Sequence, residues 1–457
     1  MGGLGGLLLC VLAGFGGMRA AWPAPRRWSA QDSLRLALAP SIGLGLLSLV
    51  YFAVRSVLGG GGGAMGGVFA AVALGLAGLA WWRAGSAAEE RRTWAKGPIW
   101  LWLVFGAVAA VAALTLVLIL VASPHGEWDA WSIWNLRARF LFRAADPMTP
   151  FNPLLNWSHP DYPLLVPAAV AGLWTWNGGE AQWLAAAVAV VFWASAVFVP
   201  VLVLARLRST AVGLTAGLAL AGMPLLTRNA SAMYADVVVG FFFVAAIGLG
   251  LLAMETPAGR GAAILAGVAA GLAAWSKNEG LLFCGVLAVT FVAAVRSRAE
   301  LAERIRLLPA LLGGMVMVLA FVGHFKYHFA PANDLVAAGK SASMAARLLD
   351  FSRYSVTFWG IAEGILTFGD WLVPPVIVFG VWLALQGIRK LDTGSILWPF
   401  LVAGLQLLGY LVVYVIGSDR LEWQLDTSAE RLLLQIWPAA VFSLLYLAKD
   451  SAATEKR

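Results

Sequence analysis

The sequence predicts an all-α protein, a polytopic transmembrane helical bundle of about thirteen spans, and three observations support this fold class. The chain of 457 residues is 61% hydrophobic and only 12% charged, whereas roughly a quarter of an ordinary soluble domain is charged. Its apolar residues gather in repeated runs of about 20, long enough as helices to cross a hydrocarbon core of about 30 Å. The runs lack the strict alternation of barrel strands, so helices are the predicted form.

The predicted spans follow one another with short polar segments between them. They cover residues 3–18, 36–57, 64–82, 98–122, 181–205, 209–226, 236–253, 262–276, 281–296, 307–323, 369–388, 394–417 and 432–448. Segments 163–175 and 353–366 are also apolar, and we interpret them as half-helices that do not cross the membrane. We divide the chain into N-terminal helices of unassigned role (1–97), a functional module (98–300) and C-terminal helices and loops (301–457).

Charge and cysteine usage argue against a nucleic-acid partner, a disulfide framework and a cysteine-based metal site. The formal net charge is +8, and loops that keep Lys and Arg on one side of a membrane explain it better than a nucleic-acid partner. The two cysteines, Cys10 and Cys284, both lie inside apolar runs. They therefore predict neither a disulfide framework nor a cysteine-based metal site.

The basic residues also predict the orientation. Alternate loops, among them 83–96 and 296–306, hold most of the Lys and Arg, and the positive-inside rule places those loops in the cytoplasm. The N-terminus is then external and the C-terminus cytoplasmic, in what we expect to be a bacterial inner (plasma) membrane. The external, periplasmic face includes segment 123–180 and holds most of the acidic residues. Because the rule says little about acidic residues, chemistry at that face is one explanation for them.

The first candidate site segment is GEWDAW, which directly follows an apolar run. It contains Glu127, Trp128, Asp129 and Trp131. A carboxylate here can act as a base, and the indole rings present flat apolar faces. An interfacial aromatic belt with one solvated carboxylate is the alternative interpretation, since tryptophans collect at membrane interfaces.

Two further segments carry acidic residues on the same predicted face. SHPDYPLLVP fixes His159, Asp161 and Tyr162 between prolines, and SAMYADVVVGFF places Asp236 at the start of a span. A rigid loop entering a half-helix explains the first equally well. A helix cap or dipole partner explains Asp236 equally well.

The fourth segment, AAWSKNEGLLF, interrupts two apolar runs with polar residues. Lys277 and Glu279 are costly at membrane depth unless they are paired or used. A polar turn between two helices, with a salt bridge between these two side chains, is the alternative to a functional role.

The order of these segments resembles the GT-C superfamily of polytopic membrane glycosyltransferases. In that superfamily an acidic residue follows a span, a proline-rich element comes next, a second acidic residue opens a later span, and a glycine-rich span ends in lysine. Asp129, HPDYPLLVP, Asp236 and Lys277 occupy these places, over roughly residues 98–300. Further on, SAERLLLQIWP places Arg431 at the entry to the last span. Three spans precede the module here instead of one.

The resemblance implies an inverting transfer of a sugar from a polyprenyl-phosphate donor to the hydroxyl of a lipid, glycan or protein acceptor, as in glycan biosynthesis of the cell envelope. Asp129 is the expected general base, with Glu127 as its rival. Lys277 is expected to contact the lipid phosphate, with Arg431 and either Arg137 or His159 as further cations. No metal site is predicted: Asp236 and Glu279 are compatible with a divalent cation but do not require one.

Two other functions stay open on the sequence alone. A secondary transporter predicts an internal repeat and ionisable groups near the bilayer centre, and neither is evident. A lipid-linked polysaccharide polymerase or ligase uses similar chemistry, but would carry an external loop rich in arginine. No segment resembles a soluble nucleotide-binding domain, so a lipid-linked donor is preferred.

Overall fold

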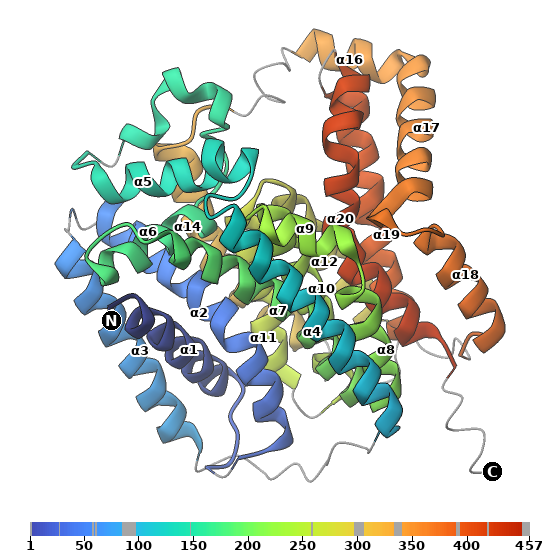
Figure 1. Ribbon diagram of the computed structural model, residues 1–457, viewed down its shortest axis with the longest axis horizontal. Helices are drawn as coiled ribbons and strands as arrows, with labels where there is room; N and C mark the ends of the chain where they lie inside the picture. Colours follow the sequence, from blue (N-terminus) through green and yellow to red (C-terminus); the bar gives the residue numbers. More distant parts are fainter. Residues whose placement is uncertain are drawn as a thin grey trace.

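A computed structural model describes residues 2–26, 28–56, 59, 62–84, 97–146, 148–256, 259–296, 306–332, 341–389, 394–417 and 420–449. Across these ranges the secondary structure is helical, apart from one isolated bridge between Ile388 and Ala448 (Figure 1). Much of the basic loops 83–96 and 296–306, on which the predicted orientation depends, lies outside the described residues.

Nine helices in the described part of the chain are long and apolar enough to cross a membrane. Each overlaps one of the predicted spans, but α20 (Leu421–Leu447) begins well before the predicted span 432–448. Together the nine helices identify an integral membrane protein whose outer helices contact lipid. They are α1 (Gly2–Ala21), α2 (Ala30–Ser56), α3 (Gly62–Arg83), α4 (Ile99–Ala122), α7 (Gln182–Leu207), α10 (Ala235–Glu255), α14 (Leu307–His328), α19 (Gly394–Ile416) and α20 (Leu421–Leu447).

Two of the remaining four predicted spans are bent. Predicted span 209–226 becomes α8 (Thr210–Ala221) and α9 (Pro224–Ser231), which meet at 59°. Pro224 disfavours a helical conformation at Met223, and Met223 is accordingly extended. The span at 369–388 forms α18 (Pro375–Gln386), bent by 84° from the preceding helices.

The other two predicted spans are shorter helices, α11 (Gly259–Ser276) and α12 (Glu279–Arg296). By length and composition the described chain therefore has nine spans, or eleven if each bent pair counts as one. The predicted number of thirteen is reached only if α11 and α12 also cross.

Short helices lie beside the end of the bundle at which α4 ends and α10 begins, which we call the site end. Both predicted half-helices are helical, as α6 (Leu165–Asn177) and α17 (Phe351–Thr367). The others are the π-helical turn η2 (Ala130–Trp134), α5 (Asn135–Arg143), η3 (Thr149–Phe151), η4 (Pro153–Ser158), α16 (Ser341–Leu349) and η5 (Phe368–Asp370). In Figure 1, α16 and α17 lie at the top of the molecule, and α5 lies in its upper left part.

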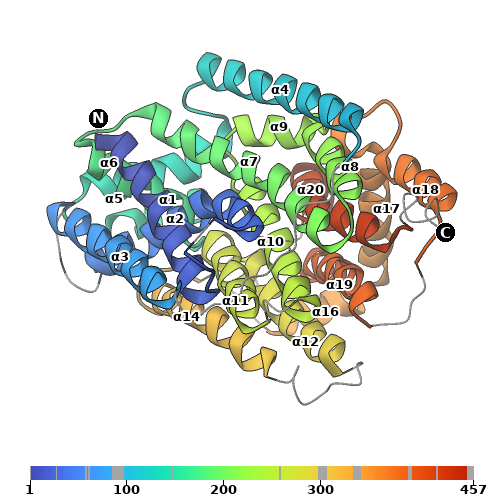
Figure 2. The ribbon, with the colours of Figure 1, turned by 90° about the horizontal axis from the view of Figure 1, so that it is seen from below.

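Helix α10 is the centre of the bundle. It packs against α7, α11, α12, α19 and α20, lies in the middle of Figure 2, and is buried along almost its entire length. Asp236 in its first turn is consequently 0% exposed. The fold thus places a carboxylate inside the protein at the site end.

Close helix contacts depend on glycine, most clearly between α11 and α14. A methyl group on Gly314 would overlap the carbonyl oxygen of Ile264, and one on Gly267 would overlap that of Leu311. Small residues allow membrane helices to approach closely and gain van der Waals contact. The adjacent Gly313 faces open space.

We predict that Gly314→Ala lowers the free energy of unfolding by about 1–3 kcal/mol, because the added methyl group pushes α14 away from α11. The thermal midpoint in detergent should fall by several degrees. Gly313→Ala is the matched control and should leave the midpoint unchanged or raise it slightly, since alanine favours a helix. Equal midpoints for the two variants would contradict the packing described here.

Candidate functional site

Asp129 and Arg431, 302 residues apart in sequence, form an ion pair at the site end. Gly126 makes the turn after α4 with φ +70°, and a Cβ there would lie 2.7 Å from the Ala232 carbonyl oxygen. The Glu127 amide donates to that same carbonyl at 3.1 Å. The turn therefore fixes the position of Asp129, the residue directly before η2, and α20 supplies the arginine.

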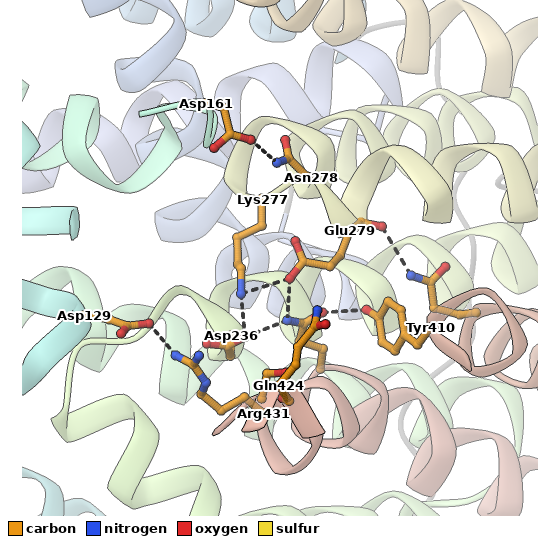
Figure 3. Close-up of polar contacts among 12 residues, drawn as sticks. Asp129, Asp161, Asp236, Lys277, Asn278, Glu279, Tyr410, Gln424 and Arg431 are labelled. Carbon is orange, nitrogen blue, oxygen red and sulfur yellow. Dashed lines mark hydrogen bonds and ion pairs between the residues drawn. The ribbon is translucent and has the colours of Figure 1, made fainter. Parts of the chain in front are cut away.

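A second, largely buried ion-pair network lies next to this pair (Figure 3). The Lys277 ammonium is 2.9 Å from Asp236 Oδ1 and 3.0 Å from Glu279 Oε1. The Gln435 side-chain amide donates to the same Asp236 oxygen at 2.6 Å, and its oxygen accepts from the Tyr410 hydroxyl at 2.5 Å. One lysine thus neutralises part of the charge of two carboxylates in the protein interior.

Helix α20 joins the two ion-paired groups. Arg431 and Gln435 are four residues apart and so lie on the same face of the helix, one turn from each other. Arg431 contacts Asp129, and Gln435 contacts Asp236. Movement of α20 would therefore disturb both groups together.

The proline-rich loop is held in place by the buried guanidinium of Arg137 and by the side-chain amide of Asn278. Arg137 is 2% exposed and donates to the carbonyl oxygens of Tyr162, Ser158 and His159 at 2.7–3.0 Å. Asn278 donates to Asp161 Oδ2 at 2.7 Å. The conformation of this loop thus depends on α5 and on the turn between α11 and α12.

Two tyrosines near the ion pairs, Tyr162 in the proline-rich loop and Tyr234 directly before α10, stay protonated at neutral pH. Burial raises the pKa of Tyr162, whose ring stacks on Trp134 and His159. Burial, and then the negative charge of Asp129, raises the pKa of Tyr234. Burial also lowers the pKa of Arg137 to about 10, so its guanidinium remains charged.

A cavity of about 480 Å³ opens beside the Asp129–Arg431 pair. Its wall combines acidic residues, two arginines and aromatic rings. The lining residues are Glu127, Trp128, Asp129, Ile133, Trp157, His159, Arg228, Asn229, Ala232, Tyr234, Trp423, Asp426, Thr427, Glu430 and Arg431. Carboxylates that accept hydrogen bonds from hydroxyls, beside rings that stack on apolar faces, suit a carbohydrate.

The structure separates the predicted site residues into three groups. Those on the cavity wall are Glu127, Trp128, Asp129, His159 and Arg431, and Trp131 packs against Trp128 with ring centroids 4.4 Å apart. Those in the buried network are Asp236, Lys277 and Glu279. Those that hold the proline-rich loop are Arg137, Asp161 and Tyr162.

For Lys277, the salt bridge with Glu279 that the sequence left open is present. For Arg137, all three contacts given above are to backbone carbonyls, which makes it a support of the loop in this conformation. The predicted phosphate contact of Lys277 stays a prediction.

Sequence reasoning missed several residues that line the cavity or hold its wall. Arg228 on α9 is paired with Asp370 at 2.7 Å and Glu430 at 3.4 Å. The ring of Tyr234 lies 5.6 Å from the Arg431 guanidinium carbon. An arginine just after Pro224, in a span broken by that proline, was the available signal for Arg228.

The described residues contain no group of three or more His, Cys, Asp or Glu side chains arranged to hold a metal ion. No protein-family model, curated protein or solved structure matches the chain. The site is therefore interpreted from its own geometry.

We predict that Lys277→Met lowers the free energy of unfolding by about 3–5 kcal/mol, because it leaves Asp236 and Glu279 buried without their cation. Thermal unfolding in detergent measures this loss. The double variant Asp236→Asn, Lys277→Met removes both charges and should recover much of the stability. A single variant as stable as the parent would show that the pair is not needed for folding and would favour a role for Lys277 in ligand binding.

Proposed function

We propose that the protein is an integral-membrane glycosyltransferase of the GT-C type, which transfers a sugar from a polyprenyl-phosphate donor to an acceptor hydroxyl. The observation that carries the proposal is the cavity in which Asp129, paired with Arg431, lies among exposed tryptophans. In the resemblance to the GT-C superfamily, Asp129 is the expected general base and Arg431 is one of the cations expected near the lipid phosphate. The donor is a lipid already present in the membrane that surrounds the bundle.

The proposed reaction is a single displacement. The acceptor oxygen forms a bond to the anomeric carbon, the bond from that carbon to the phosphate oxygen breaks, and the acceptor proton passes to the Asp129 carboxylate. The lipid phosphate leaves with the electron pair, and the anomeric centre is inverted. A positioned base and a cation for the leaving phosphate are the two groups that this reaction needs.

Asp129 and Arg431 supply these groups from the cavity wall. Arginine suits phosphate oxygens because its planar guanidinium can donate to two of them at once. His159 lines the same cavity and is the second candidate. Direct contact between Lys277 and the phosphate would require its ion pairs with Asp236 and Glu279 to open.

Two observations favour a secondary transporter as the second candidate function. The buried Lys277–Asp236–Glu279 group and the broken α8–α9 pair are features that transporters also use. A lipid-linked polysaccharide polymerase or ligase would use chemistry similar to that of the main proposal. Assays with purified protein and a panel of synthetic lipid-phosphate sugars distinguish a glycosyltransferase from a transporter, since a transporter leaves the glycosyl bond intact.

We predict that Asp129→Asn lowers the rate of transfer by about 10²- to 10⁴-fold, the usual effect of removing a positioned base. The variant should still fold and bind the donor lipid, and mass spectrometry of the products measures the rate. Asp146→Asn, exposed in the same segment but not on the cavity wall, is the matched control and should retain transfer within a few-fold. If Glu127→Gln is inactive while Asp129→Asn stays active, the base is Glu127; if both of these variants stay active, the proposal fails.

We further propose that the site end is external and that the opposite end is cytoplasmic. At the opposite end, Arg19 and Arg35 contact Asp32, and Arg208 donates to the Ala448 carbonyl oxygen at 2.7 Å. A cluster of arginines at that end agrees with the positive-inside rule.

Cysteine labelling tests this orientation. The native Cys10 and Cys284 are buried and should label slowly. We predict that Leu154→Cys, 83% exposed at the site end, reacts with an impermeant maleimide in intact cells. Lys449→Cys, exposed at the opposite end, should react only after permeabilisation. The reverse pattern would place the candidate site in the cytoplasm.

A further inference from the structure

A second cavity, of about 610 Å³, lies on the outer surface between α4 and the broken α8–α9 pair. Figure 2 shows α4 along one edge of the molecule, next to α9 and α8. The cavity wall is mostly apolar, with Val108, Val111 and Ala112 of α4 on one side. We call this cavity the apolar groove. It faces outward from the bundle, because α4 itself is largely exposed.

Arg228 lines both the apolar groove and the polar cavity that contains Asp129. Its side chain is 53% exposed and is paired with Asp370 and Glu430. The turn that presents Asp370 has positive φ at Gly369 (+91°) and at Asp370 itself (+59°). Trp371, next in sequence, donates to the Gly222 carbonyl oxygen at 3.1 Å and so ties this turn to the α8–α9 break.

We propose that the apolar groove holds the hydrocarbon chain of the lipid donor and that Arg228 contacts its phosphate at the junction with the polar cavity. This inference rests on the proposed function, and it gives the route along which the lipid donor would bind. An amphiphilic ligand lying along this route would have its chain beside α4, its phosphate at Arg228 and its sugar near Asp129.

The charges around Arg228 allow this contact. Arg228 and Arg431 both line the polar cavity, which therefore has two guanidinium groups on its wall. The contact between Arg228 and Glu430 is long, at 3.4 Å, whereas that with Asp370 is 2.7 Å. A phosphate can therefore replace Glu430 while Asp370 keeps the guanidinium oriented.

The groove suits a chain rather than a compact ligand. Its α4 wall extends from Ala107 to Ile119, a distance of about 18 Å along a helix at 1.5 Å per residue. Burial of successive methylene groups against it contributes roughly 0.8 kcal/mol each when they leave water. Its polar lining residues include Arg228 and Asp370, the pair at the junction.

Direct binding of polyprenyl phosphate without a sugar tests the inference independently of transfer. Binding to purified protein is measured by competition with a photoreactive long-chain prenyl phosphate, and thermal unfolding checks each variant. Arg228→Gln should weaken binding at least tenfold, whereas Arg143→Gln, an exposed arginine paired with Glu180, should not. Val111→Trp should weaken binding of the long-chain phosphate but not of a short-chain one. Val117→Trp, on the exposed α4 surface outside the groove, is its control.

Three outcomes decide the inference. Loss of binding in Arg228→Gln and Val111→Trp, with both controls unchanged, supports it even if no sugar is transferred, in which case only the proposed function fails. Turnover of a lipid-phosphate sugar with unchanged binding in both variants overturns the inference and leaves the proposed function intact. If Val111→Trp weakens binding of the short-chain and the long-chain phosphate equally, the substitution acts through the folding of α4. That result overturns the assignment of the groove to the hydrocarbon chain.

Discussion

The rest of the candidate site depends on the burial of Asp236. A carboxylate that is 0% exposed within a membrane bundle is costly unless a cation and hydrogen-bond donors surround it. Lys277 and Gln435 both contact its Oδ1 atom, and these contacts fix the turn after α11 and the rotation of α20. Because Arg431 is one turn from Gln435, the same constraint sets where that guanidinium meets Asp129.

This dependence explains why the buried network and the cavity have different compositions. The network is closed by its own ion pairs, whereas the cavity wall includes side chains that are partly exposed, such as Arg228 and Glu430. Ion-paired charges beneath more accessible ones suit a preorganised site, because supporting residues hold the exposed ones in position. Lys277 is best understood as such a support while its ion pairs remain closed.

The sequence predicted the apolar helices well and the contacts between them poorly. Hydropathy alone identified the nine long helices, because each needs a continuous apolar run. It could not show that Pro224 breaks a span, since a proline is compatible with an intact membrane helix. Asp129, Asp236, Lys277 and Arg431 were recognisable as polar groups at span ends. Their pairing was not, because residues 302 positions apart meet only through tertiary packing. Arg228 was missed for the same reason.

The charge balance of the polar cavity bears on the kind of donor. Its wall carries four carboxylates, on Glu127, Asp129, Asp426 and Glu430, against two guanidinium groups. Such a wall accepts hydrogen bonds from sugar hydroxyls but repels a ligand with several negative charges. A nucleotide sugar would bring the charge of two phosphates into the cavity. A sugar on a single lipid phosphate would instead leave its one phosphate at Arg228, at the mouth of the apolar groove. The acidic wall and the adjoining groove therefore favour the same donor for independent physical reasons.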